Sequence, residues 1–304
     1  MSLAPESPQP PIPGEVLLQW RRQQLQQGGR AVDLDWLLDQ AGGLAWSDLQ
    51  GLRLHPERPV VLRRSLADLA ALWGRHRRTA EPLQYLVGHC PWRDLELAVA
   101  PGVLIPRQET ELLVERALAL APPPAGVGLW ADLGTGSGCL ALALARAWPA
   151  SRGLAVDLSA EALAVAQRNW RSGGVQERIE GLAGSWWEPL RPWWGQLELV
   201  LANPPYIPSA VVEQLEPVVR EHEPRLALDG GPDGLTALRI LAAGAPAALA
   251  PGGWLLLEHH HDQSAAVLDL LRGAGLVAVA SFPDLEGHRR FAEARRPPAA
   301  PTTR

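Results

Sequence analysis

The sequence predicts an α/β fold: a Rossmann-like, doubly wound sheet covered by helices and preceded by a small helical domain. Two observations predict it. From Glu15 to about Gly74, apolar residues recur at helical spacing with no convincing strand. From Gly128 onward, strand-like and helix-like apolar runs alternate: LWADLG, CLALALARAW, RGLAVDLS, AEALAVAQRNWRS, LELVLA, GGWLLLE and GLVAVASF. Such alternation is typical of a parallel sheet with helices on both faces.

The chain divides into five expected parts. Residues 1–14 and 295–304 are rich in proline, which predicts two disordered tails. Residues 15–82 form the expected helical domain. Residues 83–105 alternate like strands around a turn, which predicts a β-hairpin linker. Residues 106–294 form the expected α/β domain, which opens with a helix in IPRQETELLVERALAL that is closed by prolines.

Composition and charge argue against several classes of protein. The 304 residues carry a formal net charge of -5, include no Lys, and have Arg scattered along the chain, so a nucleic-acid-binding stripe is not indicated. The two cysteines, Cys90 and Cys139, make no disulfide framework, and neither has a second ligand at metal spacing. The N-terminus lacks the basic start and apolar core of a signal peptide, and no apolar run approaches ~18 residues. We therefore expect a cytoplasmic protein with no membrane span and no bound metal.

A glycine-rich turn follows the first expected strand of the α/β domain. ADLGTGSGCLALALA puts Gly134, Gly136 and Gly138 between an apolar strand and an apolar helix, where the backbone can approach a ligand closely. Cys139 and Leu140 come next, so the dinucleotide fingerprint G-x-G-x-x-G is not met. This pattern favours a compact ligand edge, such as an amino-acid moiety, over a pyrophosphate. The alternative is a tight turn without a ligand.

The second expected strand, RGLAVDLS, ends on an acidic residue. Asp157 lies some 20 residues after the glycines, a spacing suited to accepting hydrogen bonds from ribose hydroxyls. Alternatively, it caps the following helix, for which Ser159 is also a natural cap. Together, the loop and the acid predict a nucleoside cofactor at the switch point of the sheet.

The strand LELVLA stops abruptly at the motif NPPY, residues 203–206. As the fourth strand it should lie next to the first, which brings Asn203 beside the glycine loop. The two prolines fix the turn, so the Asn203 carboxamide and the Pro204 carbonyl would form a rigid pair of acceptors that matches a planar NH2 group. Tyr206 would stack on the flat face of that group. The alternative is an Asn that only caps the turn.

Together these features predict a class I S-adenosylmethionine-dependent methyltransferase that acts on a planar NH2. The amine is a weak nucleophile, so positioning would supply most of the catalysis. NPPY itself does not choose between adenine N6, cytosine N4 and a glutamine side-chain amide.

A longer set of motifs resembles one family. EPLQYLVGHCPWRDLELAVAPGVLIPRQETELLVE, DLGTGSGCLALALA, LSAEALAVAQRNW, SWWEPL, NPPYIP, EPRLALDGGPDGL and PGGWLLLE, which together cover about residues 81–291, are similar to the protein-glutamine methyltransferases that act on peptide-chain release factors (PrmC, also called HemK). The resemblance implies methyl transfer from S-adenosyl-L-methionine to the glutamine of the Gly-Gly-Gln motif of class 1 release factors, with the helical domain contacting the factor.

The resemblance also implies roles for individual residues. Asn203, Pro204, Pro205 and Tyr206 would hold the glutamine, with Asn203, Pro204 and Tyr206 as the catalytic group. The residues implied for the cofactor are Gly134, Thr135, Gly136, Ser137, Gly138, Asp157, Trp186 and Asn203. Loop packing is the alternative for Trp186, because WW occurs at 186–187 and again at 193–194.

Three positions depart from the family pattern. Ser185 stands where the family usually has an Asp, and Gln108 replaces a Pro in IPRQETE. His260 replaces the glycine of Glu-x-Gly-x-x-Gln within EHHHDQ and would alter a backbone approach near the site. On a strand only His259 and His261 would share a metal ion, so a solvated strand end is the preferred interpretation.

Two other functions share parts of this pattern. An amino-methyltransferase for nucleic-acid bases would share the fold, the cofactor and NPPY, but the acidic chain and its lack of a basic stripe weigh against it. A non-catalytic S-adenosylmethionine-binding protein would not need NPPY. A nucleotide-dependent oxidoreductase is disfavoured because its fingerprint is broken at Cys139.

Overall fold

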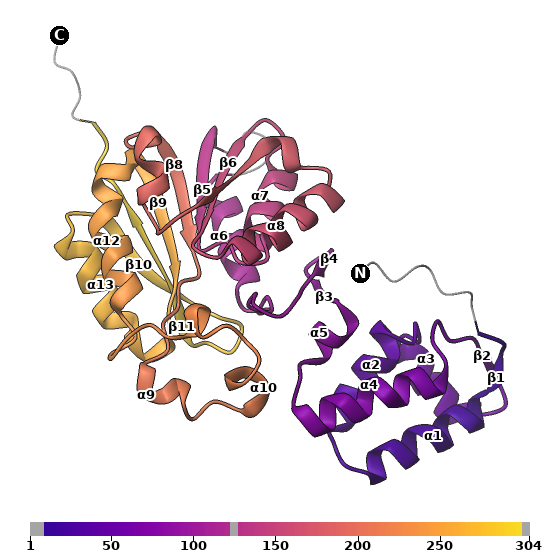
Figure 1. Ribbon diagram of the computed structural model, residues 1–304. Coiled ribbons are helices and arrows are strands. Elements are labelled where there is room, and N and C mark those ends of the chain that lie inside the picture. Colours follow the sequence, from indigo (N-terminus) through magenta and orange to yellow (C-terminus); the bar gives the residue numbers. More distant parts are fainter. Residues whose placement is uncertain (1–8, 122–126, 300–304) are drawn as a thin grey trace. The chain divides into compact units, whose positions relative to one another are not determined.

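The computed structural model describes residues 9–121 and 127–299 (Figure 1). These residues form two compact units. The first contains the described residues up to Cys90 together with Pro217–His222, and the second contains Pro91–Glu216 and the chain from Glu223 onward.

The first unit is a small helical domain, as predicted. Leu34, Leu69 and Trp73 are among the fully buried side chains of its core. Ser65 caps the fourth helix, accepting a hydrogen bond from the Asp68 amide at 3.1 Å. Its helices are α1 (Gly14–Gln26), α2 (Ala31–Gln40), α3 (Trp46–Leu54), α4 (Leu66–Thr79), α5 (Leu83–Val87) and α10 (Pro217–Arg220).

The predicted tails are shorter than expected. Strand β1 (Ile12–Pro13) pairs with β2 (Pro59–Val60), and the Gln9 amide donates to the Leu62 carbonyl, so the described part of residues 1–14 is ordered and the helical unit does contain a strand pair. Prolines are tolerated there because an edge pair needs few amide donors. At the other end the sheet includes Arg295, and the Arg296 amide donates to Gly253. Residues 1–8 and 300–304 lie outside the described residues.

The predicted hairpin linker is also shorter. Strands β3 (His89–Trp92) and β4 (Leu95–Ala98) form the hairpin, whereas Leu83–Val87 is helix α5. Pro82 precedes this helix and Gly88 ends it in the left-handed region, which are ordinary signals for a short helix. The side-chain carboxamide of Asn169 binds β4 through both its ends: its NH2 group donates to the Ala98 carbonyl, and its oxygen accepts from the Ala98 amide.

The second unit contains a seven-stranded sheet in the order β10-β11-β9-β8-β5-β6-β7 (Figure 1). As predicted, β8 lies next to β5 and runs parallel to it. β11 is antiparallel to both neighbours, which corrects the expectation of a parallel sheet. Counting LELVLA as the fourth strand implied a third strand, which is β7, but its residues were not located from the sequence, and β11 was not expected. Its strands are β5 (Leu129–Leu133), β6 (Arg152–Asp157), β7 (Ile179–Ala183), β8 (Leu197–Ala202), β9 (Leu249–Glu258), β10 (Val277–Pro283) and β11 (Arg289–Arg295).

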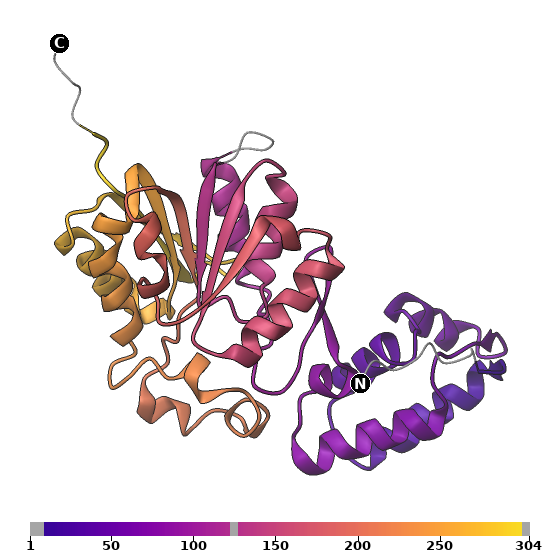
Figure 2. The same ribbon diagram turned by 45° about the horizontal axis from the view of Figure 1, so that its top comes forward.

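Helices cover both faces of this sheet, which confirms the doubly wound prediction (Figures 1 and 2). On one face lie α6 (Glu111–Leu120), α7 (Cys139–Ala147) and α8 (Ala160–Ser172), packed over a core that includes Trp130 and Trp170. On the other lie α12 (Thr236–Ala248) and α13 (Ser264–Gly273), packed over Leu255 and Leu257. Shorter elements of the unit are α9 (Ser209–Val212), α11 (Arg225–Leu228) and the 3-10 turns at Gln176–Arg178, Glu188–Trp193 and His261–Gln263.

Candidate functional site

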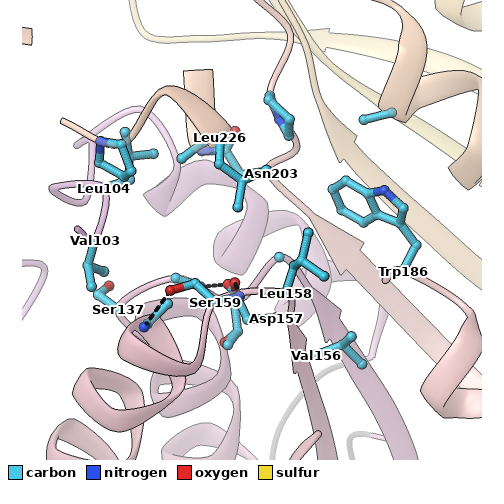
Figure 3. A pocket seen from close by; sticks show the side chains of 18 of the residues that line it. Val103, Leu104, Ser137, Val156, Asp157, Leu158, Ser159, Trp186, Asn203 and Leu226 are labelled. Atoms are coloured by element: carbon cyan, nitrogen blue, oxygen red, sulfur yellow. Dashed lines mark hydrogen bonds between the residues drawn. The ribbon is translucent and has the colours of Figure 1, made fainter. Parts of the chain in front are cut away.

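A cavity of about 530 Å³ lies in the second unit at the carboxyl ends of β5, β6 and β8 (Figure 3). Ligands of open α/β sheets bind at this edge. Asn203 and Leu226 lie on one side of the cavity, Ser137 and Asp157 lie on the other, and Trp186 lies at one end (Figure 3). Of the predicted site residues, Gly134, Thr135, Gly136, Ser137, Asp157, Trp186, Asn203 and Pro205 line it.

The glycine loop combines a ligand-facing part with a packing part. Gly134, Gly136 and Gly138 have φ angles of 73°, 55° and 78°, which L side chains rarely adopt. Gly134 and Gly136 line the cavity, whereas Gly138 is not among its lining residues. A Cβ at Gly138 would lie 2.5 Å from Trp170 Nε1, so this glycine allows α8 to approach the start of α7.

Asp157 supports the glycine loop from the end of β6. Its Oδ2 accepts from the Gly136 amide at 2.8 Å, and its Oδ1 accepts from the Ser159 amide at 2.9 Å. Burial raises the pKa of Asp157. Each carboxylate oxygen keeps a further lone pair for a ligand in the cavity. Ser159 is the residue that caps α8, accepting from the Ala162 amide, so the helix cap is Ser159 and not Asp157.

The two tryptophans of the 186–187 pair occupy different environments. Trp186 has φ of 47° and lines the cavity, with its ring edge beside Gly134. Trp187 is buried and donates from Nε1 to the Ile240 carbonyl at 3.1 Å. Trp187 therefore belongs to the core, whereas Trp186 packs partly against the same core and also offers a flat apolar surface to the cavity. Ser185 also lines the cavity.

The NPPY turn is fixed by the segments around it. Gln263 Nε2 donates to the Tyr206 carbonyl at 2.9 Å, and the Ile207 amide donates to the Leu228 carbonyl. A Cβ on Gly234 would lie 2.2 Å from the Tyr206 carbonyl oxygen, so the turn is in close contact with the glycine-containing segment at residues 230–234. Pro204 and Tyr206 are not among the described residues that line the cavity.

A buried hydrogen-bond chain joins Asn203 to Tyr206 through two other side chains. Asn203 Nδ2 donates to Thr110 Oγ1 at 2.9 Å, and Thr110 Oγ1 donates to Glu258 Oε2 at 2.7 Å. Tyr206 Oη donates to Glu258 Oε1 at 3.1 Å. Burial raises the pKa of Glu258 to about 7, and burial beside Glu258 raises the pKa of Tyr206 as well.

Thr110, Glu258 and Gln263 were not among the predicted site residues. Their motifs, IPRQETE and the Glu-x-x-x-x-Gln of EHHHDQ, were the available signal. Thr110 lines the cavity, together with Arg107 from the same loop. Arg107 forms a 2.7 Å ion pair with the buried Glu223, whose other oxygen accepts from the Ile105 amide.

The histidine run differs from its prediction of a solvated strand end. β9 ends at Glu258, and His259 is fully buried, donating from Nδ1 to the His260 carbonyl at 2.8 Å. Burial lowers the pKa of His259. His260 has ordinary extended angles, φ of -68° and ψ of 145°, so its backbone needs no glycine. Within residues 9–121 and 127–299, no group of three or more His, Cys, Asp or Glu side chains is arranged to hold a metal ion.

Comparison with known proteins identifies the family. Residues 108–230 match the model of the Methyltransferase small domain. A release factor glutamine methyltransferase of Prochlorococcus marinus is 52% identical over 93% of this chain and 97% of that protein. A protein of the same name from Geobacter sulfurreducens is 40% identical over 92% and 95% of the two chains. The chain belongs to the release factor glutamine methyltransferase family.

Family membership confirms the predicted enzyme class and the class I methyltransferase fold. Among solved structures, a release-factor-specific protein-(glutamine-N5) methyltransferase of Alicyclobacillus acidocaldarius is similar, with 31% identity, 66% of this chain and 100% of that chain covered, and a TM-score of 0.39. Among the described residues, no helix is both long enough and apolar enough to cross a membrane.

Proposed function

We propose that this protein transfers a methyl group from S-adenosyl-L-methionine to the side-chain amide nitrogen of the glutamine in the Gly-Gly-Gln motif of class 1 peptide-chain release factors. The observation that carries the proposal is the Asn203 carboxamide at the wall of the cavity. Its NH2 group is engaged by Thr110, and its oxygen has no hydrogen-bond partner among the described residues. That oxygen is an acceptor available to a planar NH2 group.

The residues around the cavity fit the cofactor. A cavity of about 530 Å³ lies within the range of sites for drug-sized ligands. In this proposal the glycine loop from Gly134 to Ser137 contacts the methionine end, Asp157 accepts from the ribose hydroxyls, and Trp186 lies against the adenine. Ser185 gives the adenine amino group a hydroxyl where the family resemblance leads one to expect a carboxylate. The cofactor would supply a methyl group on a positively charged sulfur.

The substrate amide is proposed to bind at the NPPY turn. Asn203 Oδ1 and the Pro204 carbonyl would each accept one hydrogen of the glutamine NH2, which orients the nitrogen toward the methyl group. The new N–C bond forms as the C–S bond breaks, and the nitrogen then loses a proton to solvent. The two acceptors also stabilise the positive charge that develops on the nitrogen. Pro205, which lines the cavity, would complete the wall against the flat amide, and Tyr206 would support the turn from outside the cavity lining.

The first unit is proposed to contact the release factor outside its Gly-Gly-Gln loop. This assignment rests on the family resemblance and on the presence of a separate helical unit. We further propose that the protein acts in the cytoplasm, where translation terminates, and that it uses no nucleic acid as substrate.

A methyl-transfer assay tests the proposal. The protein is incubated with S-adenosyl-L-methionine and either a bacterial class 1 release factor or duplex DNA, and products are analysed by mass spectrometry. We expect one added methyl on the Gly-Gly-Gln glutamine and none on DNA. Methylation of DNA alone would favour the nucleic-acid enzyme, and cofactor binding without transfer to either substrate would favour a binding protein.

The variant Asn203→Ala tests the role of the turn. Removing one of two acceptors should lower the transfer rate by about 100-fold or more, the scale of losing one preorganised polar group in an active site. Cofactor affinity, measured by calorimetry, should change far less, because Asp157 and the glycine loop are intact. A variant that keeps wild-type activity would contradict the assignment of Asn203.

A further inference from the structure

Behind Thr110, which lines the cavity, lies a buried carboxylate that forms no ion pair among the described residues. Glu258 is 2% exposed, and among the described residues it has no ion-pair partner. Its two oxygens accept from the hydroxyls of Thr110 and Tyr206 instead. Glu293, on the neighbouring strand, is nearly as buried but forms two hydrogen bonds with Arg116, at 2.5 and 2.7 Å. A buried carboxylate without an ion pair is costly to ionise, even though the nearby charge of Arg290 favours its ionised form, so it calls for a reason other than stability.

Thr110 is likewise used in an unusual way. It stands at the N-cap of α6, where a threonine ordinarily accepts from a helix amide, but its side chain makes no capping bond. Thr110 is 3% exposed, and its hydroxyl lies between Glu258 and Asn203. The hydrogen-bonding capacity of Thr110 is therefore used for Glu258 and Asn203 and not for capping the helix.

The direction of the hydrogen bonds among Glu258, Thr110 and Asn203 follows from which of their groups carry a hydrogen to donate. A hydroxyl has one hydrogen, and an ionised carboxylate only accepts. When Glu258 is ionised, Thr110 must give its hydrogen to Glu258, and then it can only accept from Asn203. Only the NH2 end of the Asn203 carboxamide can donate, so this end faces Thr110 and the oxygen end faces away from it.

We propose that Glu258 and Thr110 are positioning residues for glutamine methylation: they fix the rotation of the Asn203 carboxamide so that its oxygen faces the substrate NH2. This inference rests on the proposed function. The two ends of a carboxamide have nearly the same shape, so packing alone does not choose between them. A carboxamide turned by half a revolution would present NH2 to NH2, and donor would meet donor.

The same carboxylate also holds Tyr206 at the other end of the substrate-binding turn. Because Glu258 accepts from both hydroxyls, it couples the orientation of Asn203 to that of Tyr206. All four residues belong to the second unit: Thr110 is the N-cap of α6, the turn with Asn203 and Tyr206 follows β8, and Glu258 is the last residue of β9. The hydrogen-bond chain therefore fixes the turn from two sides. Neither positioning residue needs to touch the reacting atoms.

Three single variants, the double variant Thr110→Val with Glu258→Gln, and one matched control test the inference. Thr110→Val keeps the shape and removes the hydroxyl, whereas Thr110→Ser keeps the hydroxyl. Glu258→Gln replaces one of two acceptors by a donor, so either Thr110 or Tyr206 loses its acceptor. Glu293→Gln changes a similarly buried carboxylate of the same sheet that takes no part in the hydrogen-bond chain from Asn203 to Tyr206. For each, kcat and KM for release factor are measured on folded protein, and the thermal midpoint is recorded.

Thr110→Val and Glu258→Gln should each lower kcat by about 10- to 100-fold, the size expected for one charge-assisted hydrogen bond in a site. Thr110→Ser should restore most of the lost kcat. The double variant should lose no more than the worse single one, because both act on one carboxamide. Glu293→Gln should lower the thermal midpoint and leave kcat unchanged.

Additive losses in the double variant, or wild-type kcat in Thr110→Val, would overturn the inference. Equal losses in Glu258→Gln and Glu293→Gln would also overturn it, since they would indicate a general effect of buried charge. If Glu258→Gln does not fold, the comparison of Thr110→Val with Thr110→Ser decides alone. A wild-type protein that methylates no release factor would instead refute the proposed function, so the two failures are distinguishable.

Discussion

Trp186 and Trp187 are adjacent residues with different environments. Trp186 lines the cavity, and its backbone lies in the left-handed region, which turns its indole toward Gly134. Trp187 is 6% exposed, packs against α12 and donates to Ile240. A Cβ on Gly244 would lie 2.3 Å from the Trp187 ring, so α12 approaches that indole closely. The Trp186 indole packs partly against the core but also borders the cavity, whereas the Trp187 indole is enclosed by the core.

Substituting each tryptophan by alanine should separate the two roles. Trp187→Ala should lower the free energy of unfolding by about 3 kcal/mol or more, because it leaves a large buried cavity. Trp186→Ala should cost clearly less stability but weaken S-adenosylmethionine binding by about 10-fold, the scale of a lost aromatic contact. Urea unfolding and calorimetry measure the two quantities. The assignment fails if Trp186→Ala binds the cofactor as tightly as the wild type.

The turn between β5 and α7 also combines a residue that borders the cavity with a residue that serves packing. Gly136 and Gly138 both have positive φ, but a Cβ at Gly136 would meet nothing nearer than 4.0 Å. A Cβ at Gly138 would lie 2.5 Å from Trp170 and 2.8 Å from Ala166. The turn therefore needs Gly136 for its backbone and for access to the cavity, and it needs Gly138 for helix packing as well.

Gly138→Ala should destabilise the protein by about 2–4 kcal/mol, because the methyl group adds overpacking to backbone strain. Gly136→Ala should cost about 1–2 kcal/mol from strain alone and should weaken cofactor binding, since the methyl group borders the cavity. Chemical unfolding of both variants, with and without cofactor, provides the comparison. Equal destabilisation by the two substitutions would contradict the packing role of Gly138.

How far the sequence predicts these elements depends on the range of the forces involved. The glycine loop, the strand ending at Asp157 and the pairing of β8 with β5 follow from local pattern and from the topology rules of α/β sheets. The third strand, β7, could not be located and β11 was missed, because IEGLA and RRFAEAR carry charged residues and lack a clear apolar run. Helix α5 was missed because LQYLV is too short for periodicity to distinguish helix from strand.

The hydrogen-bond chain through Glu258 could not be predicted from the sequence, for a different reason. Thr110 and Glu258 are 148 residues apart, and their hydrogen bond exists only because α6 and the end of β9 meet in the folded unit. Nothing in either local motif specifies the other partner. The burial of His259 was missed similarly, because a polar run after a strand gives no indication of what covers it.

At the scale of the whole molecule, buried carboxylates determine how stability depends on pH. Burial raises the pKa of Asp132, beneath the glycine loop, and of Glu258 to about 7 each, and burial also raises the pKa of Asp157. Ordinary carboxyl groups titrate near pH 4, so between about pH 4 and 7 these three groups bind more protons in the native state than in the unfolded state. The lowered pKa of His259 acts in the opposite direction, but it is one group against three, so we expect stability to fall as the pH rises through that window.

We therefore expect the thermal midpoint to fall between pH 5 and 7.5, with a loss in the free energy of unfolding of a few kcal/mol at about 1.4 kcal/mol per pKa unit. Asp132→Asn should flatten this dependence, because an amide accepts from Thr135 at every pH and carries no buried charge. Glu180→Gln, on the exposed side of β7, is the matched control and should leave the slope unchanged. Scanning calorimetry across the range measures all three proteins. A midpoint that rises with pH would mean that these carboxylates are ionised in the fold without cost, and the reason for assigning Glu258 a positioning role would weaken with it.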